Sequence, residues 1–178
     1  INYNNVAISP ANLLIFQILD IICNSNDNIV LFTPAFPTYI ASSQYIGLSI
    51  KTVQLEKNNN FQLSKKNIDD AFLFKPKSII INSANNPTGS VYKEEELTYL
   101  VELAQKYDCW ILSDETYGML SYKNEYFSLL NLNYDKTVVI SSFSKIFAVP
   151  GYRIGFVISD PIVIEKIILS SSTLYSCL

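Results

Sequence analysis

Two long cations stand in a segment that otherwise carries mostly small hydroxyl, aromatic and apolar residues. The segment is SSFSKIFAVPGYRIG, residues 141–155, and its cations are Lys145 and Arg153, eight positions apart. A lysine amine that has lost its proton is a nucleophile, and the fork of N–H donors on an arginine suits a phosphate. Because a buried strand is predicted to end just before Lys145, we interpret the segment as part of a ligand site.

Polar residues capable of chemistry also follow two other predicted strands. Asn86 lies in NNPTG after the strand 77–83, and Asp114 and Tyr117 lie in SDETY at the end of the strand 109–114. In open parallel sheets, ligands bind beyond the carboxyl ends of the strands. The three segments together supply a carboxylate, a phenol, an amide, two serines, a lysine and an arginine. This set suits a ligand with a cationic ring, a phenolic oxygen, an aldehyde and a phosphate, and pyridoxal phosphate is such a ligand.

Other kinds of site lack their sequence signatures. No Gly-x-Gly-x-x-Gly motif follows a predicted strand and no Gly-x4-Gly-Lys-Ser/Thr motif occurs, so neither a dinucleotide site nor a P-loop is predicted. The chain has no histidine, which excludes Ser-His-Asp triads, Cys-His dyads and histidine-containing metal sites. The net charge is −3 without a Lys/Arg cluster, and no apolar run reaches membrane-spanning length. We therefore expect no metal, no nucleic-acid partner and no membrane partner.

Alternating strands and helices must position these loops. Apolar runs predict strands at 28–32, 48–55, 77–83, 109–114, 137–142 and 153–159. Helical patterns occur at 11–23, 38–46, 65–74 and 93–108, and another helix begins near Pro161. Alternation of helices with continuously apolar strands is typical of a mostly parallel sheet that is covered on both faces. The expected fold class is α/β, in three layers α/β/α.

Composition is consistent with one domain that has a large core. The chain has 178 residues, of which 49% are hydrophobic and 16% charged, whereas about a quarter is charged in a typical soluble domain. The three cysteines, Cys23, Cys109 and Cys177, are far apart and odd in number. We interpret them as reduced, buried thiols of an intracellular, cytoplasmic protein.

The motifs NNPTG, SDETY and SFSK-x7-R-x-G, in this order, resemble those of the fold-type I pyridoxal-phosphate enzymes, and most closely the class I/II aminotransferases. The similarity runs from about Ser9 to Ser159. It implies that residues 1–178 form a partial cofactor-binding large domain. Family members are longer at both ends, and we expect their amino-terminal segment and carboxyl-terminal small domain to be absent from this chain.

The resemblance implies catalytic roles for three residues. Lys145 would form a Schiff base with the cofactor aldehyde and, once freed, move a proton between the substrate Cα and C4′. Asp114 would pair with the pyridine nitrogen, and Tyr117 and Asn86 would donate to the phenolate oxygen. The competing interpretations are a surface lysine, a helix N-cap at a strand end and, for Asn86, a turn residue.

The resemblance also implies a phosphate site. Arg153 and Ser142 would hold the phosphate together with Ser144, although a packing role for Ser144 stays open. In the place of the family's first phosphate loop stands SPAN, without the usual glycine. Ala11 and Asn12 begin a predicted helix there, and its free N–H groups would still attract a phosphate.

One aromatic residue is expected at the cofactor ring. Phe36, in TPAFPTY, matches the family's stacking aromatic, with core packing and the nearby Tyr39 as alternatives.

The implied activity is an aminotransferase that moves an amino group between an amino acid and a 2-oxo acid, in a homodimer. Another pyridoxal-phosphate reaction, as in a C–S lyase, decarboxylase or synthase, is an alternative. So is a non-catalytic binding or regulatory module. Tyr117 favours the transferase, because related β-lyases commonly carry histidine at that position.

Overall fold

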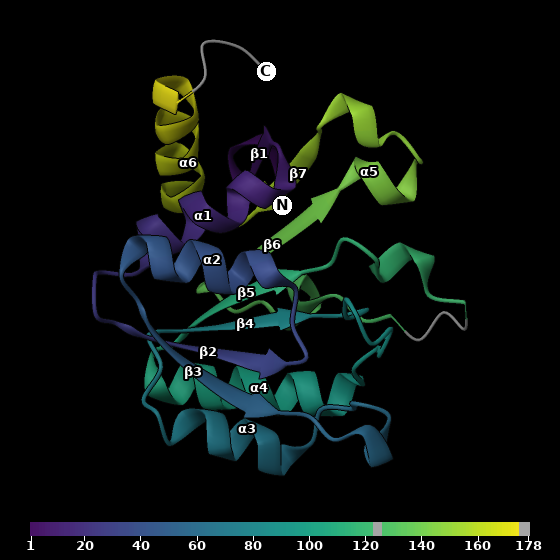
Figure 1. The fold of residues 1–178 in the computed structure, drawn as a ribbon. Helices are drawn as coiled ribbons and strands as arrows, with labels where there is room; N and C mark the ends of the chain where they lie inside the picture. The colour runs from purple at the N-terminus through teal and green to yellow at the C-terminus, as the bar shows by residue number, and fades with distance from the viewer. Residues whose placement is uncertain (123–125, 175–178) are drawn as a thin grey trace.

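The computed structural model describes residues 1–122 and 126–174, and a seven-stranded sheet runs through this part of the chain (Figure 1). The strand order is β1-β7-β6-β5-β4-β2-β3. The strands are β1 Val6–Ser9, β2 Asn28–Thr33, β3 Ser49–Gln54, β4 Ser78–Asn82, β5 Trp110–Asp114, β6 Thr137–Ser142 and β7 Gly155–Ile158. Strands β2 to β6 are parallel, whereas β7 runs antiparallel to both β6 and β1. The prediction of an α/β fold with a mostly parallel sheet is confirmed.

Helices cover both faces of the sheet, which gives the three predicted layers (Figure 1). On one face lie α1 Ala11–Ile22, α2 Pro37–Ile46 and α6 Pro161–Leu174; on the other lie α3 Lys65–Phe72 and α4 Glu94–Tyr107. A short helix, α5 Phe143–Ile146, follows β6 directly. The 3₁₀ turns are η1 Tyr3–Asn5, η2 Lys57–Asn59, η3 Gly118–Leu120, η4 Leu129–Leu132 and η5 Pro150–Tyr152.

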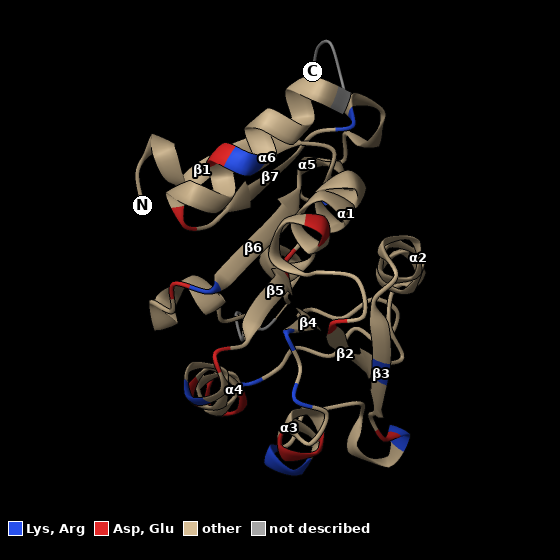
Figure 2. Cartoon of the chain, turned by 90° about the vertical axis from the view of Figure 1, so that its left-hand side faces the viewer, with Lys and Arg blue, Asp and Glu red and all other residues tan. Residues whose placement is uncertain are grey.

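The two faces of the sheet carry separate hydrophobic cores. Every residue of β4 and β6 is buried, as expected of strands covered on both sides. One core joins α1, α2 and α6 to the sheet, and the other joins α3 and α4 to it. Figure 2 shows that charged residues gather on the outer helices α3 and α4, while α2 carries none.

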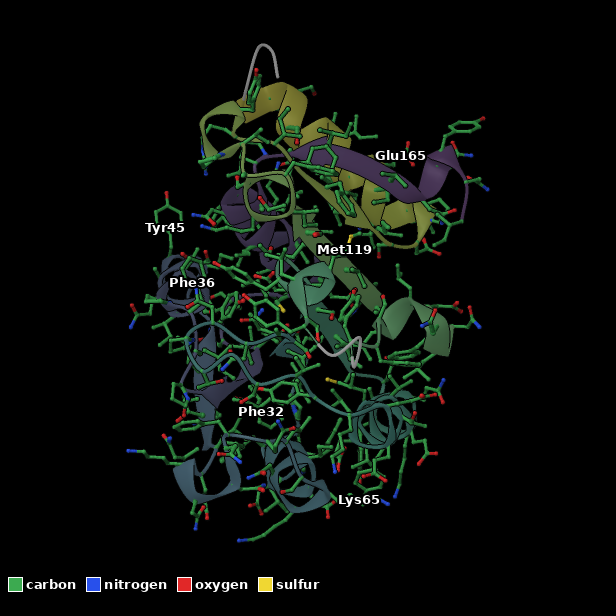
Figure 3. The ribbon with its side chains drawn as sticks, turned by 90° about the vertical axis from the view of Figure 1, so that its right-hand side faces the viewer. Phe32, Phe36, Tyr45, Lys65, Met119 and Glu165 are labelled. Atoms are coloured by element: carbon green, nitrogen blue, oxygen red, sulfur yellow. The ribbon has the colours of Figure 1, made fainter. Side chains whose placement is uncertain are left out.

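Helix α1 is buried on several sides, which explains why the pattern over 11–23 is apolar almost all the way round. Its buried side chains pack against α2, α6 and the sheet. At the edge of this packing, Phe16 meets Tyr45 edge-on, with 5.5 Å between ring centres. Figure 3 shows Tyr45 projecting from α2 at the periphery of the molecule. Packing against α2, α6 and the sheet therefore fixes the position of α1.

Two details at the β6–β7 edge differ from the sequence prediction. Strand β1 was not predicted, because four residues before Pro10 are too short for a clear pattern. The strand predicted at 153–159 begins only at Gly155, and Arg153 instead ends η5 with a left-handed backbone (φ 55°). This geometry turns the chain sharply, so that β7 can return antiparallel along β6.

The described cysteines behave as predicted. Cys23 and Cys109 are free and buried, and burial raises the pKa of each thiol to about 12. Cys177 lies outside the described residues. Among the described helices, none is both long and apolar enough to cross a bilayer.

Candidate active site

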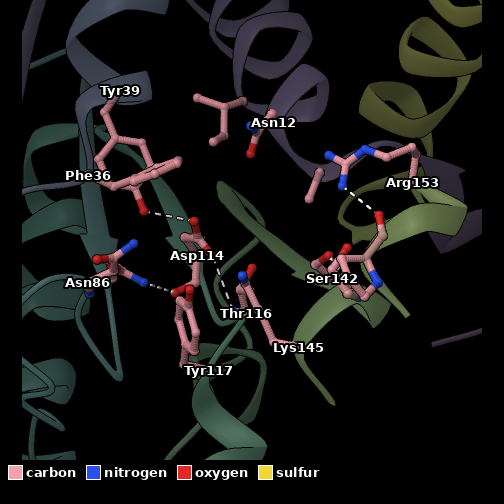
Figure 4. Close-up of a pocket in the computed structure, with 15 residues that line it drawn as sticks. Asn12, Phe36, Tyr39, Asn86, Asp114, Thr116, Tyr117, Ser142, Lys145 and Arg153 are labelled. Atoms are coloured by element: carbon pink, nitrogen blue, oxygen red, sulfur yellow. Dashed lines mark hydrogen bonds between the residues drawn. The ribbon is translucent and has the colours of Figure 1, made fainter. Parts of the chain in front are cut away.

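The carboxyl ends of β4, β5 and β6 open into a cavity of about 320 Å³ (Figure 4). This volume is at the lower end of the roughly 300–1,000 Å³ typical of small-molecule sites. The cavity brings together all ten site residues predicted from the sequence: Ala11, Asn12, Phe36, Asn86, Asp114, Tyr117, Ser142, Ser144, Lys145 and Arg153. Figure 4 shows Arg153 and Ser142 on one side, Phe36 and Tyr39 across from them, and Asp114 between.

Asp114 is the buried acid of the cavity. It ends β5 and is 7% exposed, and its two oxygens have different donors. The Tyr39 hydroxyl donates to Oδ2 at 2.7 Å, and the Thr116 amide donates to Oδ1 at 3.1 Å (Figure 4). Burial raises the pKa of Asp114, and these hydrogen bonds partly offset that rise. No cation pairs with this carboxylate among the described residues, so a positively charged ligand group would find it unpaired.

Tyr39 was predicted only as an alternative stacking residue, but the structure places it on Asp114. Burial and the carboxylate raise the pKa of its phenol well above the usual value, so Tyr39 is the proton donor of the pair. Phe36 lies edge-on to Tyr39, with 5.7 Å between ring centres, and also lines the cavity. Phe36 directly precedes α2 with an extended backbone, and Tyr39 lies in the first turn of that helix, so both enter the cavity from the start of α2. The sequence carried no pattern that indicated the bond from Tyr39 to Asp114.

Asn86 reaches the cavity through the loop after β4. Its backbone amide donates to Asn82 Oδ1 at 2.7 Å, and Asn82 Nδ2 donates to the backbone oxygen of Asp114 at 2.9 Å. Asn82 was not predicted as a site residue, although it stands directly opposite Asp114 in the β4–β5 ladder. Asn85 supports the loop from behind by donating to Pro34 O and to Thr88 Oγ1. Asn82 and Asn86 both line the cavity, whereas Asn85 only anchors the loop.

Lys145 and Tyr117 meet at the mouth of the cavity. Lys145 lies in α5, is exposed, and has its Nζ 5.9 Å from the centre of the Tyr117 ring. Tyr117 stands at the start of η3, three residues after Asp114. Ends of neighbouring strands therefore deliver an amine, a phenol and a carboxylate to one space.

Arg153 and Ser142 form the opposite side. Arg153 Nη1 donates to Pro150 O at 2.9 Å, which anchors one nitrogen of the guanidinium and leaves further donors for a ligand. Ser142 caps α5 by accepting from the Ser144 amide. Because β6 and β7 are antiparallel, the start of β7 lies at the same edge as the end of β6. That is how Arg153 comes to face Ser142.

The first turn of α1 completes this side. Leu13 and Leu14 donate to Pro10 O, whereas the amides of Ala11 and Asn12 find no acceptor among the described residues. Free amides at a helix N-terminus favour an anion.

The chemistry of these donors fits pyridoxal phosphate. Ser142, Arg153 and the free α1 amides can hold a phosphate dianion at one end. The unpaired, buried carboxylate of Asp114 suits a protonated ring nitrogen at the other end. Lys145 lies on the remaining side, where an aldehyde would need an amine. No described group of three or more His, Cys, Asp or Glu residues could hold a metal ion.

Comparison with known proteins gives a consistent result. Residues 5–178 match the family model described as aminotransferase class I and II. The chain is 33% identical over 175 residues to aspartate aminotransferase of Thermotoga maritima, covering 97% of this chain and 46% of the relative. It is 33% identical over 156 residues to a probable aspartate aminotransferase of Methanocaldococcus jannaschii, covering 87% of this chain and 40% of the relative.

Solved structures agree with the sequence relatives. A double mutant of Thermus thermophilus aspartate aminotransferase superimposes with a TM-score of 0.92 at 26% identity, covering 97% of this chain and 46% of that one. The Thermotoga maritima aspartate aminotransferase structure gives a TM-score of 0.91 at 32% identity, with 98% and 48% covered. The chain thus spans about half the length of the relatives it matches.

Proposed function

The chain belongs to the class I and II aminotransferases, and from this premise we propose that its cavity binds pyridoxal phosphate for the transfer of an amino group between an amino acid and a 2-oxo acid. The observation that carries the proposal is the meeting of three residues in one cavity: Asp114 from the end of β5, and Lys145 and Arg153 from the β6–β7 connection. We also propose that residues 1–178 form part of the cofactor-binding large domain of the protein.

The cofactor, when bound, supplies an aldehyde for covalent attachment and a ring that withdraws electrons from the substrate Cα. Lys145 Nζ is the attachment point and the base that takes and returns the proton at Cα. Asp114 would keep the ring nitrogen protonated, and Tyr39 holds the Asp114 oxygen in place through its 2.7 Å hydrogen bond. Phe36 would pack on the ring.

The other residues bind and orient. Tyr117 and Asn86 would donate to the phenolic oxygen of the ring. The phosphate would be held by Arg153, Ser142 and Ser144, together with the amides at the start of α1 and the side chain of Asn12. The phosphate takes no part in the reaction, so the hydrogen bonds to it would keep the ring in one position relative to Lys145 throughout.

The relatives support a substrate and an assembly. Two of them carry the name aspartate aminotransferase or probable aspartate aminotransferase, so we propose aspartate as the amino donor. Exposed apolar residues near Tyr117, among them Met119 (71% exposed) and Leu120, support a homodimer. The buried free thiols Cys23 and Cys109 support a reducing, cytoplasmic location. Light scattering of the purified chain tests the dimer.

The cofactor proposal is tested by absorbance. The chain mixed with pyridoxal phosphate is expected to develop a visible band of lysine-bound cofactor, and borohydride should fix the cofactor to Lys145, as peptide mass spectrometry would show. Lys145→Ala should develop no band. A wild-type chain that never develops the band refutes the proposal.

Turnover is tested separately on the same protein. Aspartate with 2-oxoglutarate is expected to give oxaloacetate and glutamate. Release of pyruvate or sulfide from amino acids without an oxo-acid acceptor would instead indicate a lyase.

A further inference from the structure

Gly155, the last residue of the SFSK-x7-R-x-G motif, lies in the most crowded contact beside the candidate phosphate site. It is the first residue of β7, and it pairs with Ser142 of β6 on one side and Ser9 of β1 on the other. A Cβ atom built on Gly155 would lie 2.8 Å from Ser141 O, 2.9 Å from Ala11 Cβ and 3.0 Å from Ala11 N. Real side chains essentially never approach so closely, so a larger residue would have to move its surroundings.

The atoms that would have to move are mostly backbone. Ser141 O belongs to β6, whose residues are all buried, and Ala11 N belongs to the first turn of α1. A flexible side chain could turn away, whereas a strand and a helix can only separate. Any side chain at position 155 would therefore push the start of α1 and the end of β6 apart.

Those two elements carry opposite halves of the phosphate site. Ala11 and Asn12 offer their free amides from α1, and Ser142 and Ser144 lie at the end of β6 and in α5. Hydrogen bonds weaken steeply once they are stretched or bent, so both halves reach one phosphate only at a fixed separation.

We propose that Gly155 is a positioning residue for the cofactor phosphate: its missing side chain sets the spacing between the α1 amides and the β6 hydroxyls. This inference rests on the proposed function, because it concerns the phosphate of the same cofactor. The α1 loop, SPAN, itself lacks a glycine, so the close approach of α1 to the sheet at this site depends on the missing side chain of Gly155.

The requirement at Gly155 is for space. Its φ lies outside the left-handed range, so alanine can adopt the same backbone conformation. Gly151, four residues earlier in the same motif, provides a matched control. A Cβ built on Gly151 has no heavy atom within 4 Å, and its φ is likewise not left-handed.

The experiment compares two aldehydes that differ only in the phosphate. Pyridoxal phosphate and pyridoxal are titrated into wild type, Gly155→Ala and Gly151→Ala, and dissociation constants are taken from absorbance. For Gly155→Ala we expect pyridoxal-phosphate affinity to fall about tenfold or more, as when one charge-assisted hydrogen bond is lost. Pyridoxal affinity should change by less than about twofold, and Gly151→Ala should match wild type for both ligands.

A second variant approaches the same contact from the helix. Ala11→Val adds methyl groups to the Cβ that faces Gly155, so it should cause the same selective loss even where Gly155→Ala does not fold. Circular dichroism of each variant checks folding.

The outcomes separate the two proposals. A wild type that prefers pyridoxal phosphate to pyridoxal, with variants at 155 and 11 that keep the full preference or lose both ligands equally, overturns the role of Gly155 alone. A wild type that binds neither aldehyde overturns the proposed function and this inference with it.

Discussion

Replacing Tyr39 by phenylalanine removes one hydroxyl and keeps the ring that packs beside Phe36. The hydroxyl donates to Asp114 Oδ2 at 2.7 Å in a buried setting, so the variant leaves that oxygen without its donor. The Thr116 amide still donates to Oδ1. The loss is therefore one hydrogen bond to one buried oxygen, and its size depends on whether Asp114 carries a charge.

The expected magnitude follows from that charge state. A hydrogen bond to an ionised group contributes about 1.5–3 kcal/mol, and a bond between neutral groups about 0.5–1.5 kcal/mol. The difference, on the order of 1–1.5 kcal/mol, favours the neutral form once the donor is lost, so the variant raises the Asp114 pKa further. Burial already raises the pKa of this carboxyl above its usual value.

The sign of the pH dependence follows from linkage. A raised folded-state pKa of an acid means that its stabilising contribution is present below the unfolded pKa, about 3.9, and is lost as pH rises through the folded value. Because Tyr39→Phe raises the folded value further, its destabilisation should be constant at low pH and grow as pH rises from the folded pKa of the wild type, itself raised by burial, toward that of the variant. It should level off once Asp114 is ionised in both folded proteins.

The assay is urea unfolding of the cofactor-free chain at several pH values, with Tyr134→Phe as the control. The Tyr134 hydroxyl donates to two backbone oxygens, Cys109 O at 2.9 Å and Ala104 O at 3.1 Å, so its loss involves neutral acceptors. We expect a constant loss for Tyr134→Phe and a growing loss for Tyr39→Phe. If the two variants show the same flat dependence, the reasoning about a charged Asp114–Tyr39 pair is wrong.

Two further changes test neighbouring features. Asp114→Asn should stabilise the cofactor-free chain at pH 7 by roughly 0.5–2 kcal/mol, because it removes a buried carboxyl whose raised pKa makes ionisation costly. The same change should weaken pyridoxal-phosphate binding. Urea unfolding at pH 7 and pH 4 checks that the gain in stability disappears at the lower pH. Gly118→Ala should lower the free energy of unfolding by about 1–3 kcal/mol, since its Cβ would lie 2.3 Å from the Tyr126 ring, whose hydroxyl donates to Glu115. In thermal melts, adding Tyr126→Ala should remove most of this extra cost. Additive losses in the double variant would contradict the contact.

The sequence allowed the layers and the site edge to be predicted because both follow from local patterns. Apolar runs mark buried strands such as β4 and β6, and polar residues directly after them mark the edge where ligands bind. Asp114 and Lys145 could be placed by this rule alone. The roles assigned to them through the family resemblance stay predictions until the binding experiments are made.

Pairwise contacts between distant elements could not be predicted in the same way. The bond from Tyr39 to Asp114 joins residues 75 positions apart, and nothing in either local pattern specifies it. The close approach of Gly155 to Ala11 likewise depends on how α1 lies on the sheet. The sequence predicted the correct sheet edge for Arg153 but assigned the residue to a strand. In the structure its left-handed backbone belongs to the turn before β7.

The direction of β7 explains why so much of the site fits within one short motif. A parallel β7 would need a crossover of roughly a dozen residues or more, and it would begin at the opposite edge of the sheet. The antiparallel return lets Ser142 and Gly155 face each other across one hairpin, with Lys145 and Arg153 in the loop between them. The short spacing K-x7-R is therefore compatible only with an antiparallel β7, and an insertion long enough to reverse that strand would move the arginine away from the lysine by about the length of the strand.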